Sequence, residues 1–448
     1  MKTIIETALS RGAARAEVFY LNSLQTEVNY EAGRLKELAN TEETGVALRL
    51  VKDGKLGFAT TTKLTHLDRL VDDALATASC GDDMEFDFAV AGGLPDSTCF
   101  DKTVAELSVD EMMKHSEAGV ARLLDYEKDI QTESGTTRDL QTIHVMNSDG
   151  VDAKFERTQY QFYIQGRLIE GTSMLDGGAY FGGTALDVDF DRLYETAVNE
   201  FRRARTNVDL ATGRTTVVLT PRAVADIMLT LNLGVSGAHV EQGISPLVGK
   251  LERPIFDERI TIRDDGLRPG GYRSAPFDDE GVPMQTTTVV ESGVLKSYLT
   301  DLRTARKLNH ADTGNGLKAK RLVGTKELGK SPTPEITNWV MEGGEKSHEE
   351  LLSDVGSGVL VDSIMGLLMS NLVAGEFGGN LAYGLKIEDG KTTGRVKDAM
   401  ISGNIYKLFK SNVIALSKDV ELTGILGGIG THWYPYVILK DVTIATKS

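Results

Sequence analysis

The hydrophobic positions along the chain follow two different periods, so both strands and helices are expected. Apolar residues recur at every second position from Ala16 to Tyr30, which is the pattern of a strand with one buried face. The segment from Gln131 to Glu170 is extended in the same way. Helical periodicity predicts three helices, at about Thr65 to Ala78, near 109 to 125, and from Phe190 to Thr206. Together these patterns favour a β-rich α/β fold.

Tight hairpins are predicted where a turn-forming pair stands between two apolar runs. The pairs are Asp53-Gly54, Ser292-Gly293 and Asp389-Gly390. Their residue types suit the left-handed backbone conformation that two-residue hairpin turns require. The chain also contains 47 glycines and 10 prolines, a balance that favours hairpins over proline-rich linkers.

The chain is expected to contain more than one domain, because a single hydrophobic core stops growing at roughly 250 to 300 residues. Residues 80–108 lack a regular period and contain several glycines, which predicts a loop between two subdomains. Further on, a buried-strand run precedes Thr220-Pro221, a pair that can cap and begin a helix. We therefore expect an N-terminal α/β domain of residues 1–210, with a subdivision near 80–108, and a C-terminal domain of residues 211–448.

The composition indicates a soluble cytoplasmic protein. There are 65 acidic and 49 basic residues, and the net charge of -16 opposes binding to the phosphate backbone of nucleic acids. The chain has only two cysteines, Cys80 and Cys99, and so low a cysteine content is typical of proteins in a reducing compartment. The most apolar later stretch, Ser363 to Gly375, is shorter than the ~20 residues that span a bilayer. We expect binding neither to nucleic acid nor to a membrane.

A hydrolytic metal site would need closely spaced imidazoles and carboxylates, with a glutamate to activate water. No two of the 7 histidines lie within six residues of each other. The His-Glu-x-x-His motif is therefore absent, and so is the variant with one more residue between the histidines. His239 and Glu241 are the remaining candidate ligands or catalytic groups, although a lone histidine after a helix is more often packed or solvated.

Two other patterns resemble binding sites. The acidic runs Asp264-Asp265 and Asp278-Asp279-Glu280 could hold a divalent cation, but turn chemistry and solvent exposure explain them more simply. Residues 324–331 match the phosphate-loop pattern, but Pro332 and Pro334 oppose the helix that this motif must begin. We expect a loop there, and Lys318 to lie in a solvated part of the same region. No cofactor is expected to bind there.

A succession of segments in the second half resembles the TldD/PmbA peptidase family. The segments are Phe277–Pro283, Val290–Asp301, Thr304–Leu308, Thr313–Asn315, Thr337–Trp339, Asn371–Phe377 and Ile401–Asn404. The resemblance is firm from about 213 to 448 and looser before that, where it rests on Gly45–Arg49 and Asn147–Gly150.

The resemblance implies a two-part α/β architecture, with mixed and antiparallel sheets and flanking helices. It also implies a dimer that encloses a peptide-cleaving chamber and acts on unfolded peptides. Active, TldD-type members bind zinc through a His-Glu-x-x-x-His helix and a cysteine near the C-terminus. The equivalent helix here, Pro221 to His239, contains no His-Glu pair, and no cysteine follows Cys99.

The chain therefore resembles the metal-free TldE/PmbA-type members of the family. We expect a peptidase subunit without its own cofactor, paired with a zinc-containing TldD-type subunit or with a second copy of itself. Two alternatives remain open. One is an autonomous metallopeptidase that uses His239 and Glu241 with a ligand from a second chain, and the other is a peptide-binding scaffold without hydrolytic activity. The family has also been named for modulation of DNA gyrase, but the negative net charge opposes contact with DNA.

Overall fold

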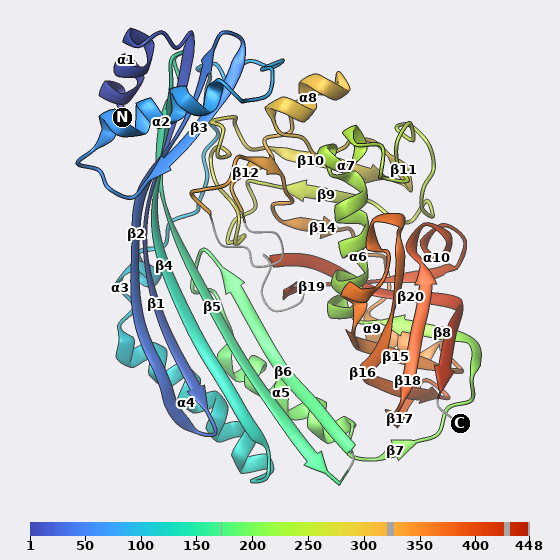
Figure 1. The fold of residues 1–448 in the computed structure, drawn as a ribbon. Helices are drawn as coiled ribbons and strands as arrows, with labels where there is room; N and C mark the ends of the chain where they lie inside the picture. Colours follow the sequence, from blue (N-terminus) through green and yellow to red (C-terminus); the bar gives the residue numbers. More distant parts are fainter. Residues whose placement is uncertain (172, 320–326, 425–430, 447–448) are drawn as a thin grey trace.

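The computed structural model describes residues 1–171, 173–319, 327–424 and 431–446. The first six strands form one sheet, and a 12-stranded sheet is built from later strands (Figure 1). A two-stranded sheet joins β12 (Gly316–Leu317) to β13 (Thr333–Pro334). Helices flank both large sheets, which confirms the predicted β-rich α/β class.

The 6-stranded sheet is antiparallel throughout and has the order β3-β2-β1-β4-β5-β6. Several of its strands are unusually long, and Figure 1 shows them curving together along one side of the molecule. The strands are β1 (Arg15–Glu31), β2 (Arg34–Lys52), β3 (Lys55–Thr61), β4 (Gln131–Asn147), β5 (Asp152–Glu170) and β6 (Ser173–Gly183). Both predicted extended segments therefore lie in this sheet.

The longer helices cover this sheet because each of them carries an apolar stripe. In α5, for example, Tyr194, Ala197, Val198 and Phe201 are buried. The helices of this half are α1 (Lys2–Ser10), α2 (Leu67–Ala78), α3 (Lys102–Glu106), α4 (Val109–Tyr126) and α5 (Phe190–Arg203). The three helices predicted from periodicity are confirmed as α2, α4 and α5.

The 12-stranded sheet mixes parallel and antiparallel pairs, as predicted. Its main order is β11-β10-β9-β14-β20-β8-β15-β16-β17-β7, and β18 and β19 pair with β20 beside this path. The strands are β7 (Asn207–Val208), β8 (Gly213–Leu219), β9 (Ile262–Asp265), β10 (Thr286–Glu291), β11 (Val294–Leu295), β14 (Trp339–Met341), β15 (Ser357–Met365), β16 (Glu376–Glu388), β17 (Lys391–Val396), β18 (Ala399–Asn404), β19 (Val413–Gly424) and β20 (Thr431–Thr446).

The three predicted hairpin turns are confirmed. Both residues of each pair have positive φ, with values of 52° and 76° at Asp53-Gly54, 45° and 77° at Ser292-Gly293, and 49° and 73° at Asp389-Gly390. Positive φ at both central positions is the geometry that matches the twist of the flanking strands.

The helix α6 (Pro221–Val235) forms the centre of the C-terminal core, and almost all of its residues are buried. Its start follows the prediction, because the Thr220 side chain accepts a hydrogen bond from the Ala223 amide and Pro221 occupies the first turn. The other helices of this half are α7 (Gly237–Glu241), α8 (Leu302–Leu308), α9 (His348–Ser353), α10 (Ile405–Ser411) and the 3-10 turns η1 (Leu367–Met369) and η2 (Leu372–Ala374).

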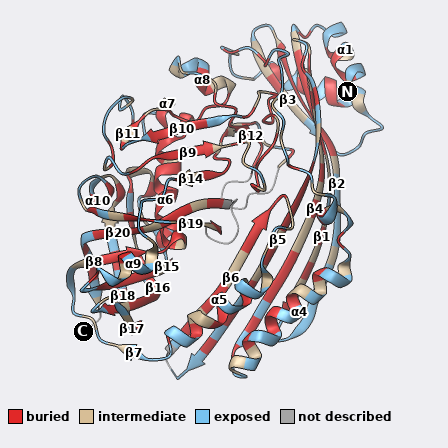
Figure 2. Cartoon of the chain, turned by 180° about the vertical axis from the view of Figure 1, so that it is seen from behind, coloured by how far each residue is buried: buried red, intermediate tan, exposed pale blue. Residues whose placement is uncertain are grey.

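Buried residues concentrate on the strands, whereas α4 and α5 expose one side to solvent (Figure 2). In the described part of the chain, no helix is both long enough and apolar enough to cross a membrane. The phosphate-loop pattern lies partly outside the described residues. Its described end, Glu327–Ser331, forms a turn, and the short strand β13 rather than a helix follows it.

Candidate functional site at the junction of the two halves

The turn from Phe277 to Pro283 joins the C-terminal half to the N-terminal sheet. Phe277 is 1% exposed, and its ring meets that of Phe155 on β5 edge to face, with centroids 4.9 Å apart. Gly281 approaches the sheet so closely that a Cβ atom there would lie 2.9 Å from Val151 Cγ1. The turn is therefore packed between the halves.

Ion pairs also cross this junction. Arg49 on β2 donates to the Glu17 carboxylate at 2.7 and 2.9 Å, and to Glu280 Oε1 at 2.8 Å. The three residues are 4%, 2% and 1% exposed, respectively. One guanidinium thus lies between two buried carboxylates, and it links the turn of the C-terminal half to two strands of the N-terminal sheet.

The expected solvent exposure of Asp278-Asp279-Glu280 is wrong, because their carboxylates hydrogen-bond to backbone amides inside the protein. Asp278 accepts hydrogen bonds from the amides of Glu280, Val282 and Gly316 at 2.9, 3.0 and 2.8 Å. Asp279 accepts one from the Lys318 amide at 2.7 Å. The expected turn is present, and it is stabilised by these bonds.

Lys318 is also buried, at 1% exposed, in contrast to the solvated position expected from the sequence. Its ammonium lies 5.4 Å from the centre of the Phe19 ring and 5.0 Å from that of Phe58. These aromatic faces compensate part of the cost of burying a cation. Lys318 also donates to the Lys330 carbonyl.

Burial changes the proton affinity of the junction carboxylates. It raises the pKa of Glu280 to about 8, and the charges of Asp301 and Glu17 add to this, while Arg49 opposes it. The pKa of Asp278 is raised well above its usual range, first by burial and then by the Glu280 charge. Proton binding at this junction is thus shifted toward neutral pH.

A second buried carboxylate brings distant segments together. Asp264 accepts hydrogen bonds from Asn315 Nδ2 at 2.7 Å, and from the amide and hydroxyl of Thr337 at 2.7 and 2.8 Å. Burial raises the pKa of Asp264 to about 6, although these hydrogen bonds oppose the shift. Asn315 and Thr337 belong to two of the segments on which the family resemblance rests.

A pocket of about 450 Å³ opens beside this junction. One wall is the segment 86–90 of the N-terminal half, and the others are the turn Val282-Pro283 and helix α8. Its lining residues are Phe86, Asp87, Phe88, Ala89, Val90, Val282, Pro283, Leu302, Ala305, Arg306, Asn309, His310 and Asp312. Apolar residues form the larger part of this lining, together with several polar and charged groups, as in small-molecule sites.

Sequence reasoning missed Arg49, Glu17 and the 86–90 wall. The sequence could have indicated that Arg49 is buried, because it is a charged residue inside the apolar run of a strand. Glu17 lies opposite it in the β1–β2 register. The 86–90 wall lies in a loop with no periodicity, so no local pattern could have indicated it.

His239 and Glu241 occupy the short helix α7, where each already has a partner. His239 is 6% exposed, and its Nδ1 lies 2.7 Å from the Leu233 carbonyl oxygen. Glu241 pairs with Arg303, whose Nη1 lies 2.9 Å from Oε1. Neither residue belongs to a three-membered group of ligand atoms within the described residues.

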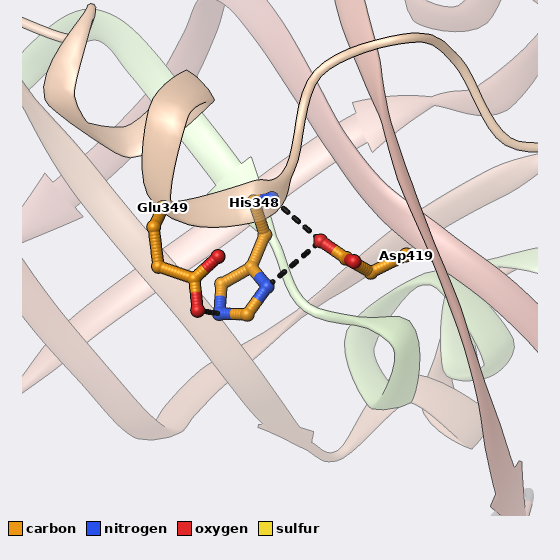
Figure 3. A group of neighbouring side chains, drawn as sticks. All are labelled: His348, Glu349 and Asp419. Carbon is orange, nitrogen blue, oxygen red and sulfur yellow. Dashed lines mark hydrogen bonds and ion pairs between the residues drawn. The ribbon is translucent and has the colours of Figure 1, made fainter.

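Among the described residues, the group with metal-like spacing is His348, Glu349 and Asp419 (Figure 3). Asp419 Oδ2 accepts from the His348 amide at 2.7 Å and lies 3.1 Å from His348 Nδ1, while Nε2 lies 3.2 Å from Glu349. The ring stacks on Tyr436. These contacts cap the start of α9 at the surface, and the hydrogen bonds from His348 lower the pKa of Asp419.

Three family models match successive parts of the chain. Residues 212–446 match the model of the PmbA/TldA metallopeptidase C-terminal domain. Residues 16–78 match domain 1 of the same metallopeptidases, and residues 102–205 match their central domain. The chain belongs to the PmbA/TldD metallopeptidase family. Its function class is therefore peptidase-related, and the predicted family resemblance is confirmed.

Individual PmbA/TldD relatives are similar over nearly the whole chain. An uncharacterized protein of Methanocaldococcus jannaschii is 27% identical over 91% of this chain and 92% of its own length. A metalloprotease of Methanothermobacter thermautotrophicus is 27% identical over 87% of this chain and 85% of its own. The crystal structure of TldE from Thermococcus kodakarensis has the same fold, with a TM-score of 0.89, 23% identity and 99% of both chains covered.

The side chains of α6 do not fit the metal that the PmbA/TldD family name implies. The buried positions of α6 carry apolar side chains together with Asp226, Thr230 and Asn232, and none carries an imidazole or a thiolate. The group of His348, Glu349 and Asp419 lies apart from α6, at the start of α9. A hydrolytic zinc needs three protein ligands and an open position for water.

Proposed function

We propose that this chain is the TldE/PmbA-type subunit of a cytoplasmic two-chain metallopeptidase that acts on unfolded peptides. In this assembly a TldD-type subunit supplies the zinc and the catalytic glutamate. The present chain helps to bind the peptide and to enclose the site. A homodimer is the alternative to this heterodimer.

The observation that carries the proposal is the composition of α6. The family resemblance assigns metal binding to this helix, yet its sequence contains no histidine, cysteine or glutamate. The two candidate metal ligands near this helix already have other contacts. Glu241 pairs with Arg303, and His239 contacts the Leu233 carbonyl oxygen. Family membership supplies the peptidase context.

The pocket beside the junction supports a role in peptide binding. It is lined by residues from two segments on which the family resemblance rests, the turn Phe277–Pro283 and the helix segment Thr304–Leu308. Its mostly apolar walls would accept the side chains that unfolded peptides expose and folded proteins bury.

Two measurements on the purified full-length chain test the proposal. The first is its zinc and iron content after removal of loosely bound metal, and the expected result is a small fraction of one ion per chain. The second is cleavage of an unstructured peptide by the chain alone, by a TldD-type protein alone and by both together. Cleavage should require the TldD-type protein and should rise when the present chain is added.

A contrary result would identify one of the alternatives. Stoichiometric metal, with chelator-sensitive cleavage by the chain alone that His239→Ala abolishes, would establish an autonomous metallopeptidase and overturn the proposal. Peptide binding without cleavage in any combination would also overturn it, in favour of a scaffold.

A further inference from the structure

The pocket is formed by one face of α8 and an extended segment opposite it. Leu302, Ala305 and Arg306 have the i, i+3, i+4 spacing that places side chains on one side of a helix, and Asn309 follows as the left-handed C-cap of α8. Phe86, Phe88 and Ala89 line the same pocket from the N-terminal half, and Leu302 packs against Phe86 and Phe88. Both halves of the chain thus line one pocket.

The floor of the pocket is apolar. Phe86, Phe88 and Ala305 are 7%, 2% and 7% exposed, respectively, so their positions are fixed by packing. Val90, by contrast, is 71% exposed at the edge of the pocket, where an apolar ligand would cover it. A volume of about 450 Å³ is within the range of ligand sites.

Most charged groups around the pocket already have partners. Asp87 pairs with Arg15, and Lys307 on α8 pairs with Glu85, which directly precedes the pocket residue Phe86. Asp312 accepts a hydrogen bond from the Gly314 amide at 3.1 Å. His310 Nδ1 lies 2.8 Å from the Ala311 carbonyl oxygen, and its ring packs near Tyr298.

Arg306 differs from these groups. Its side chain is exposed and makes neither an ion pair nor a hydrogen bond within the described residues, although Asp87 and Asp312 line the same pocket. Its guanidinium is therefore available to a ligand, and guanidinium groups bind carboxylates through two parallel hydrogen bonds.

We propose that this pocket binds the C-terminal residue of a peptide, with an apolar side chain on the Phe86–Phe88 floor and the terminal carboxylate at Arg306. The inference rests on the proposed function, since it names the part of the peptide that this subunit recognises. The paired acids Asp87 and Asp312 at the same rim disfavour a second negative charge. A C-terminal aspartate should therefore bind more weakly than a C-terminal leucine.

The test uses a fluorescein-labelled hexapeptide that ends in leucine, prepared once with a free C-terminal carboxylate and once as the amide. Fluorescence anisotropy measures the binding of each peptide to the full-length chain. The carboxylate form should bind about tenfold more tightly than the amide. Arg306→Gln should remove most of this difference, because it weakens the carboxylate form and leaves the amide form nearly unchanged.

Arg34→Gln is the matched control, because it removes the same charge and the same side chain at an exposed position that does not line the pocket. Its affinities should equal those of the wild type. Equal binding of the two peptides by the wild-type chain, or equal losses in the two variants, would overturn the inference.

The outcomes separate this inference from the proposed function. If the two peptides bind equally well and the chain still stimulates cleavage by a TldD-type protein, only the C-terminal pocket is wrong. If neither peptide binds and no stimulation occurs, both proposals are wrong.

Discussion

Arg49 Nη1 lies 2.8 Å from Glu280 Oε1, although 231 positions separate the two residues in the chain. This ion pair is buried, and it joins a strand of the N-terminal sheet to a turn of the C-terminal half. The same turn supplies Val282 and Pro283 to the pocket. The stability of the junction and the shape of the pocket are therefore expected to change together.

Arg49→Leu should strongly destabilise the protein, because it leaves two buried carboxylates without their cation. Removal of one partner of a buried ion pair typically costs about 3–5 kcal/mol of unfolding free energy. Denaturant unfolding monitored by circular dichroism measures the change. The matched control is Arg34→Leu, at an exposed position of the same strand, which should change stability by less than about 0.5 kcal/mol. Equal effects of the two substitutions would contradict a special role for Arg49.

The raised pKa of Glu280, about 8, predicts a pH-dependent stability. In the unfolded chain this carboxyl loses its proton near pH ~4.3, whereas the folded protein retains it to higher pH. The unfolded state therefore binds fewer protons between these values, and the free energy of unfolding should fall as pH rises from about 5 to about 8. Denaturant unfolding across this range measures the slope.

Glu280→Gln should make that slope shallower, because the amide does not titrate. Some dependence should remain, since the pKa of Asp278 is also raised by burial. Glu42→Gln, at an exposed position of β2, is the control and should leave the slope as in the wild type. A Glu280→Gln slope as steep as that of the wild type would show that this carboxyl does not contribute.

Gly281→Ala should destabilise the junction turn for two reasons. Gly281 has a φ of +79°, which disfavours any Cβ atom, and the added atom would also lie 2.9 Å from Val151 Cγ1. Gly54→Ala is a matched control with a φ of +76° and no atom within 4 Å of the added Cβ. Thermal unfolding should show a loss of about 1 kcal/mol for the control and a clearly larger loss for Gly281→Ala. Equal losses would mean that the turn adjusts freely.

Asn232→Leu should leave the stability unchanged or increase it slightly. Asn232 is 8% exposed in α6, and neither atom of its amide has a hydrogen-bond partner in the described structure. Its replacement removes a desolvation cost of about 1–3 kcal/mol. Asn338→Leu is the contrast, since the Asn338 amide donates to the Asp265 carbonyl at 2.8 Å and to Ser274 Oγ at 3.0 Å. A loss in Asn232→Leu as large as in Asn338→Leu would indicate that Asn232 has a bound partner in solution.

Local signals in the sequence predicted the local parts of the fold well. Turn chemistry identified the Asp53-Gly54 hairpin, and periodicity identified α4 to within a residue or two at each end. The junction could not be derived in this way, because the burial of Asp278 and Lys318 depends on segments far away in the chain. Acidic runs are usually solvated, and here the exception arises because backbone amides of the 280–318 region satisfy the carboxylates. The predicted roles of His239 and Glu241, and the domain boundary near residue 210, stay predictions.

The position of β20 has a consequence for the order of folding. This strand follows every other described strand in the chain, yet it pairs with β8, β14, β18 and β19. During synthesis, the 6-stranded sheet has all of its strands once residue 183 has emerged, whereas the 12-stranded sheet lacks a central member until residues 431–446 appear. The long stretch between these points exposes unpaired strand edges on the nascent chain, and such edges favour aggregation. The C-terminal half is therefore the part of this protein that should depend most on chaperones during synthesis.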